Sequence, residues 1–257
     1  MREKKDIVIS GGGLAGLIAA AAFGNSGYEV LCVDPKKSKN KGQPEHLDIR
    51  TTAYLQPSQT FLQKIGVWQL VNGSSAPLKI MRIIDAAGKK LTVKDFNSSD
   101  ISDTPFGWNV RNSDMRAGLL AKIKTLPNVK FETGLSTLST TTRSSVASVS
   151  LSNGHIVECS LLIAADGRDS PIRTQAAIAV KHTDFDQIAL SFSVTHEVPH
   201  NNISTEVHKT GGPFTLVPLP DFEGKPCSAI VWMDNTENMD KRKSLPNSVF
   251  DLSLIHI

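Results

Sequence analysis

Apolar positions near the start of the chain form two runs of different character. Residues 7–9 are a short β-branched run, which is typical of a buried parallel strand. After a glycine-rich turn, residues 14–23 are apolar apart from one glycine and have the length of a buried helix, with glycines in 24–27 to end it. A second short strand then closes at Asp34. The pattern predicts strand, turn, helix and strand over residues 6–34.

The middle of the chain contains segments whose apolar residues have helical spacing and segments typical of strands. Apolar residues from Tyr54 to Ile65 recur mainly at helical spacing, with Gly66 as the expected C-cap. A short strand over 107–111 leads into a helix predicted over 114–125, and extended structure resumes at 129–132.

Two hairpins and a series of alternating strands complete the pattern. Residues 78–96 turn at Ala86-Ala87-Gly88, and residues 145–165 turn at Ser152-Asn153-Gly154. From Ile188 onward, alternating strands separated by Pro, Gly and Asn turns indicate an antiparallel sheet.

The first turn carries the G-x-G-x-x-G pattern of a dinucleotide-binding site. Gly11 allows the tight turn, Gly13 lets the backbone approach a pyrophosphate, and Gly16 lets the helix pack closely on the sheet. Leu14 and Ala15 complete the motif at the helix N-terminus, where free N–H groups and the positive dipole end favour an anion. The alternative is a purely structural glycine turn, against which the flanking strands and helix argue.

An acidic residue at the end of the second strand refines this prediction. Asp34 follows Gly16 at the spacing expected for a carboxylate that accepts a hydrogen bond from a ribose hydroxyl. The same charge would repel a 2′-phosphate. FAD or NAD therefore fits this turn better than NADP.

Composition is that of an ordinary globular protein. The chain has 257 residues, of which 40% are hydrophobic and 21% charged, and its net charge is +3. The clearest basic cluster is Lys36, Lys37, Lys39 and Lys41, in the loop after Asp34. No aromatic residues interleave with these lysines, so we expect a solvated loop and no nucleic-acid binding.

Cysteines and hydropathy point to a cytoplasmic protein. Cys32, Cys159 and Cys227 are widely separated and lack metal-ligand spacing, which favours buried, reduced thiols over disulfides or zinc. The first strand begins too early to leave room for a signal peptide. The longest apolar run is about half of the ~20 residues that a membrane span needs.

Further motifs, read with the first, make the chain resemble the para-hydroxybenzoate hydroxylase class of FAD-dependent monooxygenases. Within this class it is most similar to the ubiquinone-biosynthesis hydroxylases. The segments that carry the resemblance are DIRTTA (48–53), IGVW (65–68), LIAADGRDSPIR (162–173), GGPF (211–214) and LVPLP (216–220).

The resemblance implies further cofactor-binding residues. Arg50 would reach the pyrophosphate or adenosine side of FAD, where a guanidinium pairs with phosphate oxygens; the alternative is a surface salt bridge. Arg111 would contact the flavin's linker, although Arg116 is an alternative. Asp166 and Gly167 fall on the family's Asp-Gly motif, beside the ribityl and ribose region.

Substrate contacts are implied for one later strand. Pro213, Phe214 and Leu216 lie where family members present a strand towards the substrate ring. Core packing would explain a Phe-x-Leu strand equally well.

One family motif is absent. The third flavin motif, a Gly-Asp-Ala turn followed by a Gly-rich helix, does not occur in the sequence, and we expect a C-terminally truncated chain. The fold class that follows is α/β, a Rossmann-like FAD-binding domain with an inserted β-rich (α+β) substrate domain. We predict the FAD-binding domain at 1–70 and 98–180 and the incomplete substrate domain at 71–97 and 181–257.

The resemblance also implies an activity. NAD(P)H would reduce FAD, O2 would give a flavin hydroperoxide, and a phenolic substrate with an isoprenoid tail would be hydroxylated in ubiquinone biosynthesis. Such an enzyme would work within a ubiquinone-biosynthesis complex or at the surface of the inner membrane. Alternatives are another FAD oxidoreductase of the same fold, such as a dehydrogenase or halogenase, and an inactive fragment.

Overall fold

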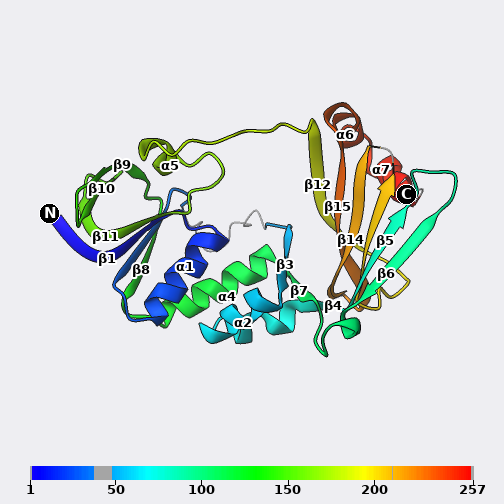
Figure 1. Cartoon of the computed structure of the whole chain (residues 1–257), viewed down its shortest axis with the longest axis horizontal. Helices are drawn as coiled ribbons and strands as arrows, with labels where there is room; N and C mark the ends of the chain where they lie inside the picture. The colour runs from blue at the N-terminus through cyan, green and yellow to red at the C-terminus, as the bar shows by residue number, and fades with distance from the viewer. Residues whose placement is uncertain (1, 38–47, 210, 256–257) are drawn as a thin grey trace. The chain divides into compact units, whose positions relative to one another are not determined.

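The computed structural model describes residues 2–37, 48–209 and 211–255. The chain divides into two compact units, each assembled from segments that are far apart in the sequence (Figure 1). The first comprises the described parts of Met1–Leu47, Phe61–Gly73 and Ser113–Lys181, and the second those of Asp48–Thr60, Ser74–Asn112 and His182–Ile257. Compactness does not say what each unit binds, so the division into FAD-binding and substrate domains stays a prediction.

A six-stranded sheet forms the centre of the first unit, in the order β8-β2-β1-β11-β10-β9. Its first four strands run parallel, whereas β10 is antiparallel to both of its neighbours. The strands are β1 (Arg2–Ser10), β2 (Val30–Asp34), β8 (Val129–Thr133), β9 (Thr137–Thr142), β10 (Ala147–Leu151) and β11 (Ile156–Ala164).

Both faces of this sheet are buried at β2 and at the second half of β1. The helix α1 (Leu14–Asn25) connects β1 to β2 and packs on β1, β2 and β8. Val8, Leu31 and Val33 point to one face of the sheet, where they pack with apolar residues of β10 and β11. Burial on both faces explains the near-continuous apolar strands that the sequence shows. The other helical segments that lie wholly or partly in this unit are α2 (Gln56–Lys64), α3 (Trp68–Val71), η1 (Asn72–Ser74), α4 (Asn112–Lys124) and α5 (Pro171–Gln175).

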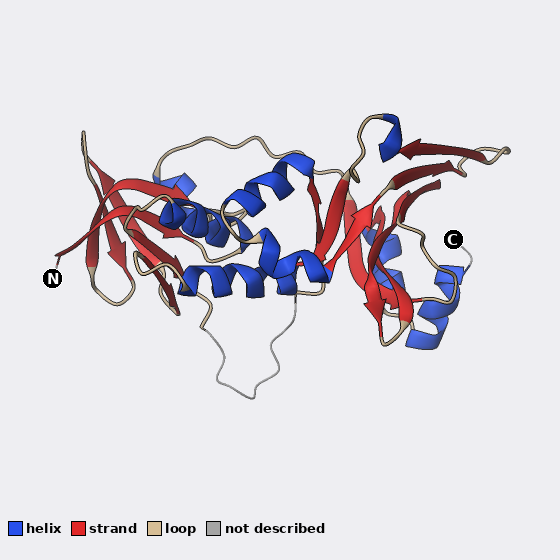
Figure 2. Ribbon diagram, turned by 90° about the horizontal axis from the view of Figure 1, so that it is seen from below, coloured by secondary structure: helices blue, strands red, loops and turns tan. Residues whose placement is uncertain are grey.

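Strands dominate the second unit, as Figure 2 shows. A six-stranded sheet has the order β12-β15-β14-β13-β5-β6, and a smaller sheet has the order β3-β7-β4. The bounds are β3 (Thr51–Leu55), β4 (Ser75–Leu78), β5 (Ile80–Asp85), β6 (Thr92–Asn97), β7 (Gly107–Arg111), β12 (Gln187–Thr195), β13 (Ile203–Lys209), β14 (Gly212–Phe222) and β15 (Lys225–Asn235). The helical segments are η2 (Ser98–Asp100), α6 (Thr236–Lys243) and α7 (Asn247–Ile255).

Side chains of the larger sheet alternate between two apolar clusters. On one face Phe214, Ile230 and Trp232 pack with Met239 of α6. On the other face Leu219, Cys227 and Ala229 form a separate cluster. Contacts of β14 with β4 and β7 hold the smaller sheet in the same unit, and the buried Asn109 amide donates to the Pro218 carbonyl over 3.0 Å.

The structure confirms most of the predicted elements. Both hairpins form, and the α/β class with a Rossmann-like parallel core and a β-rich second part is confirmed. One expectation is wrong: Tyr54 and Leu55 lie in β3, and the helix begins only at Gln56. The antiparallel pairing expected for the strands from Ile188 onward is confirmed for β12 to β15, and the sheet continues through a parallel pair of β13 with β5.

The cysteines are as expected. Cys32, Cys159 and Cys227 are free and buried. Burial raises the pKa of the Cys32 thiol to about 12, and the nearby Asp34 adds to the rise. Among the described residues, no helix is long and apolar enough to cross a membrane.

Candidate functional site

The turn between β1 and α1 excludes side chains at two of its glycines. Gly11 has φ +107°, and a Cβ there would overlap the carbonyl of Ala165 at the end of β11. A Cβ on Gly16 would overlap the carbonyl oxygen of Gly11. These two glycines therefore permit the close approach of β1, α1 and β11.

Gly13 differs from both because the space beside it is open. It is the N-cap of α1, with φ −69° and ψ −179°, a backbone conformation that any residue adopts. A Cβ on Gly13 would meet nothing within 4 Å. The first N–H groups of α1, including those of Leu14 and Ala15, have no carbonyl acceptor one turn earlier in the helix. The open space beside Gly13 makes the backbone at these groups accessible. An anion has room to approach this end of the helix.

Asp34 ends β2 directly beside this turn and is 9% exposed. Its Oδ2 accepts a hydrogen bond from the Gly12 N–H over 2.7 Å, and its Oδ1 accepts one from the Lys36 N–H over 2.8 Å. Each carboxylate oxygen has a further lone pair, so a ribose hydroxyl remains a compatible partner. Asp34 therefore shapes the loop, and its contact with a ribose stays a prediction.

The middle glycine of the turn, which sequence reasoning did not single out, is held from several sides. Besides the Asp34 contact, its carbonyl accepts a hydrogen bond from Nη1 of Arg116 on α4. A Cβ on Gly12 would lie 2.6 Å from Cε2 of Phe131 and 2.8 Å from the Asp34 carboxylate. The run of three glycines at 11–13 was the available signal for Gly12, but no local pattern indicates Arg116 or Phe131 as its neighbours.

Asp166 and Gly167 follow β11 and lie next to the glycine turn. A Cβ on Gly11 would approach the Asp166 N–H nitrogen at 2.8 Å, which places the two motifs side by side. Oδ2 of Asp166 accepts from the Ile172 N–H over 3.2 Å, whereas Oδ1 is buried and has no partner among the described residues. A buried acceptor without a donor is costly, and a ligand hydroxyl would satisfy it. Gly167 has φ +101°, and the space beside its α-carbon is open.

Arg50, in the second unit, forms a forked ion pair. Its Nε and Nη2 donate to the two carboxylate oxygens of Asp48, each over 2.7 Å. The hydrogen bonds from Arg50 hold the pKa of Asp48 at about 2, well below its usual range. The Arg50 side chain is 69% exposed, so its guanidinium has free surface for a second anion. Its contact with the cofactor stays a prediction.

Arg111 also lies in the second unit, at the end of β7. It is paired across the smaller sheet with Thr51, and its Nη2 donates to the Cys227 sulfur over 3.6 Å. Arg50 and Arg111 are thus brought to one end of the β3–β7 pair, where the Arg50 carbonyl accepts from the Asn112 N–H over 2.9 Å. The contact of Arg111 with the flavin's linker stays a prediction.

The predicted substrate residues occupy both faces of β14. Phe214 is 6% exposed and packs edge-on against the Trp232 ring, with centroids 5.6 Å apart. Leu216 lies on the same face, and alternation along the strand places Pro213 on the other. Core packing therefore accounts for most of the Phe214 surface, and a substrate role for these residues stays a prediction.

A cavity of about 1040 Å³ borders the face that carries Phe214 and Leu216. Apolar residues of several strands line its wall, among them Val194, Val207 and Ile230. Its volume is close to the upper end of the range of small-molecule sites, which is about 300–1,000 Å³.

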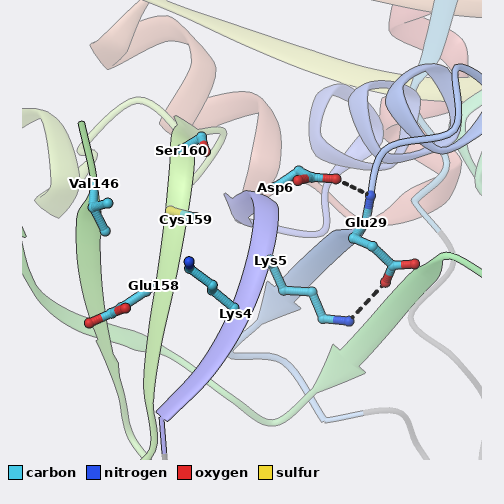
Figure 3. Close-up of a pocket in the computed structure, with 8 residues that line it drawn as sticks. All are labelled: Lys4, Lys5, Asp6, Glu29, Val146, Glu158, Cys159 and Ser160. Carbon is cyan, nitrogen blue, oxygen red and sulfur yellow. Dashed lines mark hydrogen bonds and ion pairs between the residues drawn. The ribbon is translucent and has the colours of Figure 1, made fainter.

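A smaller hollow of about 280 Å³ lies in the first unit, far along β1 from the glycine turn (Figure 3). Charged side chains of both signs line it, including Lys4, Lys5, Glu29 and Glu158. Lys5 is paired with Glu29 over 3.1 Å, so these two charges offset each other within the hollow.

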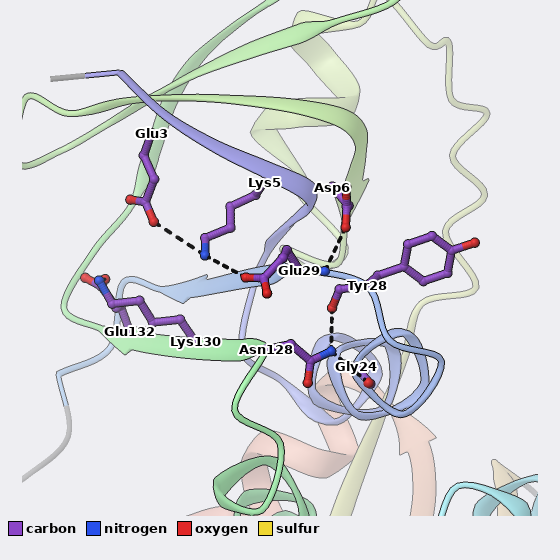
Figure 4. Close-up of polar contacts among 9 residues, drawn as sticks. All are labelled: Glu3, Lys5, Asp6, Gly24, Tyr28, Glu29, Asn128, Lys130 and Glu132. Carbon is purple, nitrogen blue, oxygen red and sulfur yellow. Dashed lines mark hydrogen bonds and ion pairs between the residues drawn. The ribbon is translucent and has the colours of Figure 1, made fainter.

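Polar contacts around this end of the unit anchor the loop between α1 and β2 (Figure 4). The Asn128 amide donates to the carbonyls of Gly24 and Tyr28, over 2.9 and 2.7 Å. Asp6 accepts from the Glu29 N–H over 2.8 Å. Fixing the C-terminal end of α1 also fixes the direction in which its N-terminus points.

In the part of the chain that the structure describes, no group of three or more His, Cys, Asp or Glu side chains has the arrangement of a metal site.

Comparison with known proteins places these features in a family. The family described as an FAD binding domain matches residues 4–247. Ubiquinone hydroxylase UbiL of Rhodospirillum rubrum is 28% identical over 254 residues, which is 97% of this chain and 56% of that protein. Ubiquinone biosynthesis monooxygenase COQ6 of Danio rerio is 27% identical over 265 residues, covering 96% of this chain and 53% of its own length.

Solved structures agree on the fold. PqsL, a probable FAD-dependent monooxygenase from Pseudomonas aeruginosa, superposes with a TM-score of 0.76 at 18% identity, covering 93% of this chain and 63% of that one. The chain thus spans little more than half the length of the curated relatives it matches.

Proposed function

The chain belongs to the FAD-binding domain family, and on that premise we propose that it forms part of a flavin-dependent monooxygenase that hydroxylates a phenol in ubiquinone biosynthesis. The predicted resemblance to FAD-dependent hydroxylases is confirmed by the family match and by the ubiquinone hydroxylases among its relatives. The activity of the whole protein is the proposed part, because the chain spans only part of those relatives.

The residues present fit FAD. The observation that carries the proposal is the meeting of the glycine turn with Asp166, whose Oδ1 is buried without a donor. A dinucleotide supplies what this site lacks, namely phosphates for the start of α1 and hydroxyls for buried carboxylate oxygens. Gly13 leaves the room that a pyrophosphate needs.

Each residue has a defined task in this proposal. The Gly13 region would bind the pyrophosphate through backbone N–H groups, Asp34 would accept from the adenosine ribose, and Asp166 would accept from a second hydroxyl. Arg50 and Arg111 would add cationic contacts to FAD. When bound, FAD supplies the redox chemistry with O2, and the chain positions it and excludes water.

The substrate class follows from the relatives. We infer a phenol with an isoprenoid tail, with NAD(P)H as the electron donor, because the matched relatives are named as ubiquinone hydroxylases. Pro213, Phe214 and Leu216 are the proposed substrate contacts. A peripheral membrane contact and a ubiquinone-biosynthesis complex belong to the same proposal, since such a substrate resides in lipid.

Flavin analysis followed by turnover tests the proposal. A version of the protein that contains this chain and extends to its relatives' length should show the visible absorption of bound FAD. It should also oxidise NAD(P)H faster when a prenylated phenol is present, with hydroxylated product formed. Bound FAD with substrate-independent oxidation would favour another FAD oxidoreductase, and absence of FAD would reject the proposal.

A further inference from the structure

Arg116 approaches the glycine turn from outside the G-x-G-x-x-G motif. It lies on α4, and its Nη1 donates to the carbonyl of Gly12, the residue directly before the N-cap of α1. Its guanidinium carbon also lies 6.0 Å from the centre of the Phe131 ring. Only one of the five N–H donors of the guanidinium is used in these contacts, because the ring contact uses none.

Gly12 is thereby fixed at both of its backbone polar groups, which belong to two successive peptide units. Asp34 accepts from its N–H and Arg116 donates to its carbonyl, so the loop cannot rotate without breaking a charged hydrogen bond on either side. The next residue, Gly13, begins the set of free N–H groups at the start of α1. The direction of those N–H groups therefore depends on Arg116.

Arg116 brings a second positive charge to the start of α1, which already carries the positive partial charge of a helix N-terminus. The first turn of α1 contains no acidic residue, and the Asp34 carboxylate on the Gly12 N–H is the anion beside it. A bound anion in front of the helix would be attracted by the helix end and by the guanidinium together.

We propose that Arg116 is a positioning residue for the cofactor pyrophosphate, fixing the Gly12–Gly13 peptide unit through its carbonyl and adding its charge to the positive end of α1. This inference rests on the proposed FAD site. It separates the work of two side chains: Asp34 serves the adenosine ribose, and Arg116 serves the phosphates.

Two soluble probes distinguish these roles. ADP carries the ribose and the pyrophosphate of FAD, whereas adenosine carries no phosphate. Arg116→Gln should bind ADP about ten-fold or more weakly, since a charge-assisted contact is lost, and should bind adenosine as the unsubstituted chain does. Arg116→Lys, which keeps the charge, should recover much of the ADP affinity. The ADP affinity of Arg116→Gln should also fall less steeply with added salt.

Lys124→Gln is the matched control, because it removes a cation from the last turn of the same helix. It should leave both affinities unchanged. Equal loss of ADP and adenosine binding in Arg116→Gln would show a merely structural residue and overturn the proposal, as would undiminished ADP binding. If the unsubstituted chain bound neither FAD nor ADP, the proposed cofactor site would itself be wrong, and Arg116 would have no pyrophosphate to position.

Discussion

At the scale of single residues, the glycine turn shows what sequence spacing reveals and what it omits. The spacing of Gly11, Gly13 and Gly16 was enough to predict a close-packed turn with one accessible position, and the sterics agree. The contact between Gly12 and Arg116 joins residues that are 104 positions apart in the sequence, so no local sequence pattern predicts it. Long-range contacts of this kind depend on the packing of α4, which periodicity does not specify.

Asp34→Ala should weaken FAD binding by about ten-fold or more. The variant loses a charged acceptor for the ribose, a contact worth about 1.5 to 3 kcal/mol, and releases the Gly12 N–H. Titration of the protein with FAD, followed by flavin fluorescence, gives the dissociation constants of both forms. An unchanged dissociation constant in a folded variant would exclude a ribose contact at Asp34.

Arg50→Gln should raise the pKa of Asp48 from about 2 towards the ordinary 3.8, because the hydrogen bonds from the guanidinium are the largest cause of its depression. Because the pKa of Asp48 is lower in the folded state than in the unfolded chain, its ionised form stabilises the folded state at pH values above the unfolded pKa. That contribution disappears as pH falls from about 4 to 2. Carboxyl-detected NMR titration of both forms measures the shift. A titration midpoint of Asp48 that did not move would contradict the ion pair.

At the scale of helices and strands, the sequence predicted the structure most reliably in segments with a single hydrophobic period. The hairpins and the buried parallel strands followed directly from alternation and apolar runs. Tyr54 and Leu55 continue a helical spacing but pair with Trp108 and Gly107 of β7, so tertiary pairing overrode the local pattern. The placement of Phe214 needed the register of β14, which sets the face that each side chain occupies.

Gly24→Ala should destabilise the first unit, although alanine is the better helix former. A Cβ at Gly24 would overlap a methyl group of Val129, a stiff side chain on β8. Overpacking of this kind costs about 1 to 3 kcal/mol, which exceeds the gain of about 1 kcal/mol in helix propensity. Urea unfolding measures the change in free energy.

Asn25→Ala, at the next and exposed position of the same helix, is the control and should be neutral or slightly stabilising. If both substitutions changed the free energy of unfolding equally, the packing of α1 on β8 would be misassigned.

At the scale of the whole molecule, the proposed cofactor site lies in the first unit, and the proposed activity is the one for which longer relatives are named. The glycine turn, Asp34 and Asp166 meet within that unit, and all of them were predicted from the sequence. Arg50, Arg111 and the β14 residues belong to the second unit, so their roles towards FAD or substrate remain predictions. The proposed roles of the second unit therefore depend on FAD binding at the glycine turn, Asp34 and Asp166.

FAD binding by the chain with and without a methyl group at Gly13 is the decisive measurement for the cofactor site. Gly13→Ala is free of strain and of clashes, so it should fold normally yet weaken FAD binding about ten-fold or more by holding the pyrophosphate away from the backbone. Gly73→Ala, equally open and remote in sequence from the turn, is the control and should bind FAD as the unsubstituted chain does. Saturable FAD binding that only Gly13→Ala impairs is the predicted result. Equal FAD affinity in all three proteins would contradict the assignment of the turn.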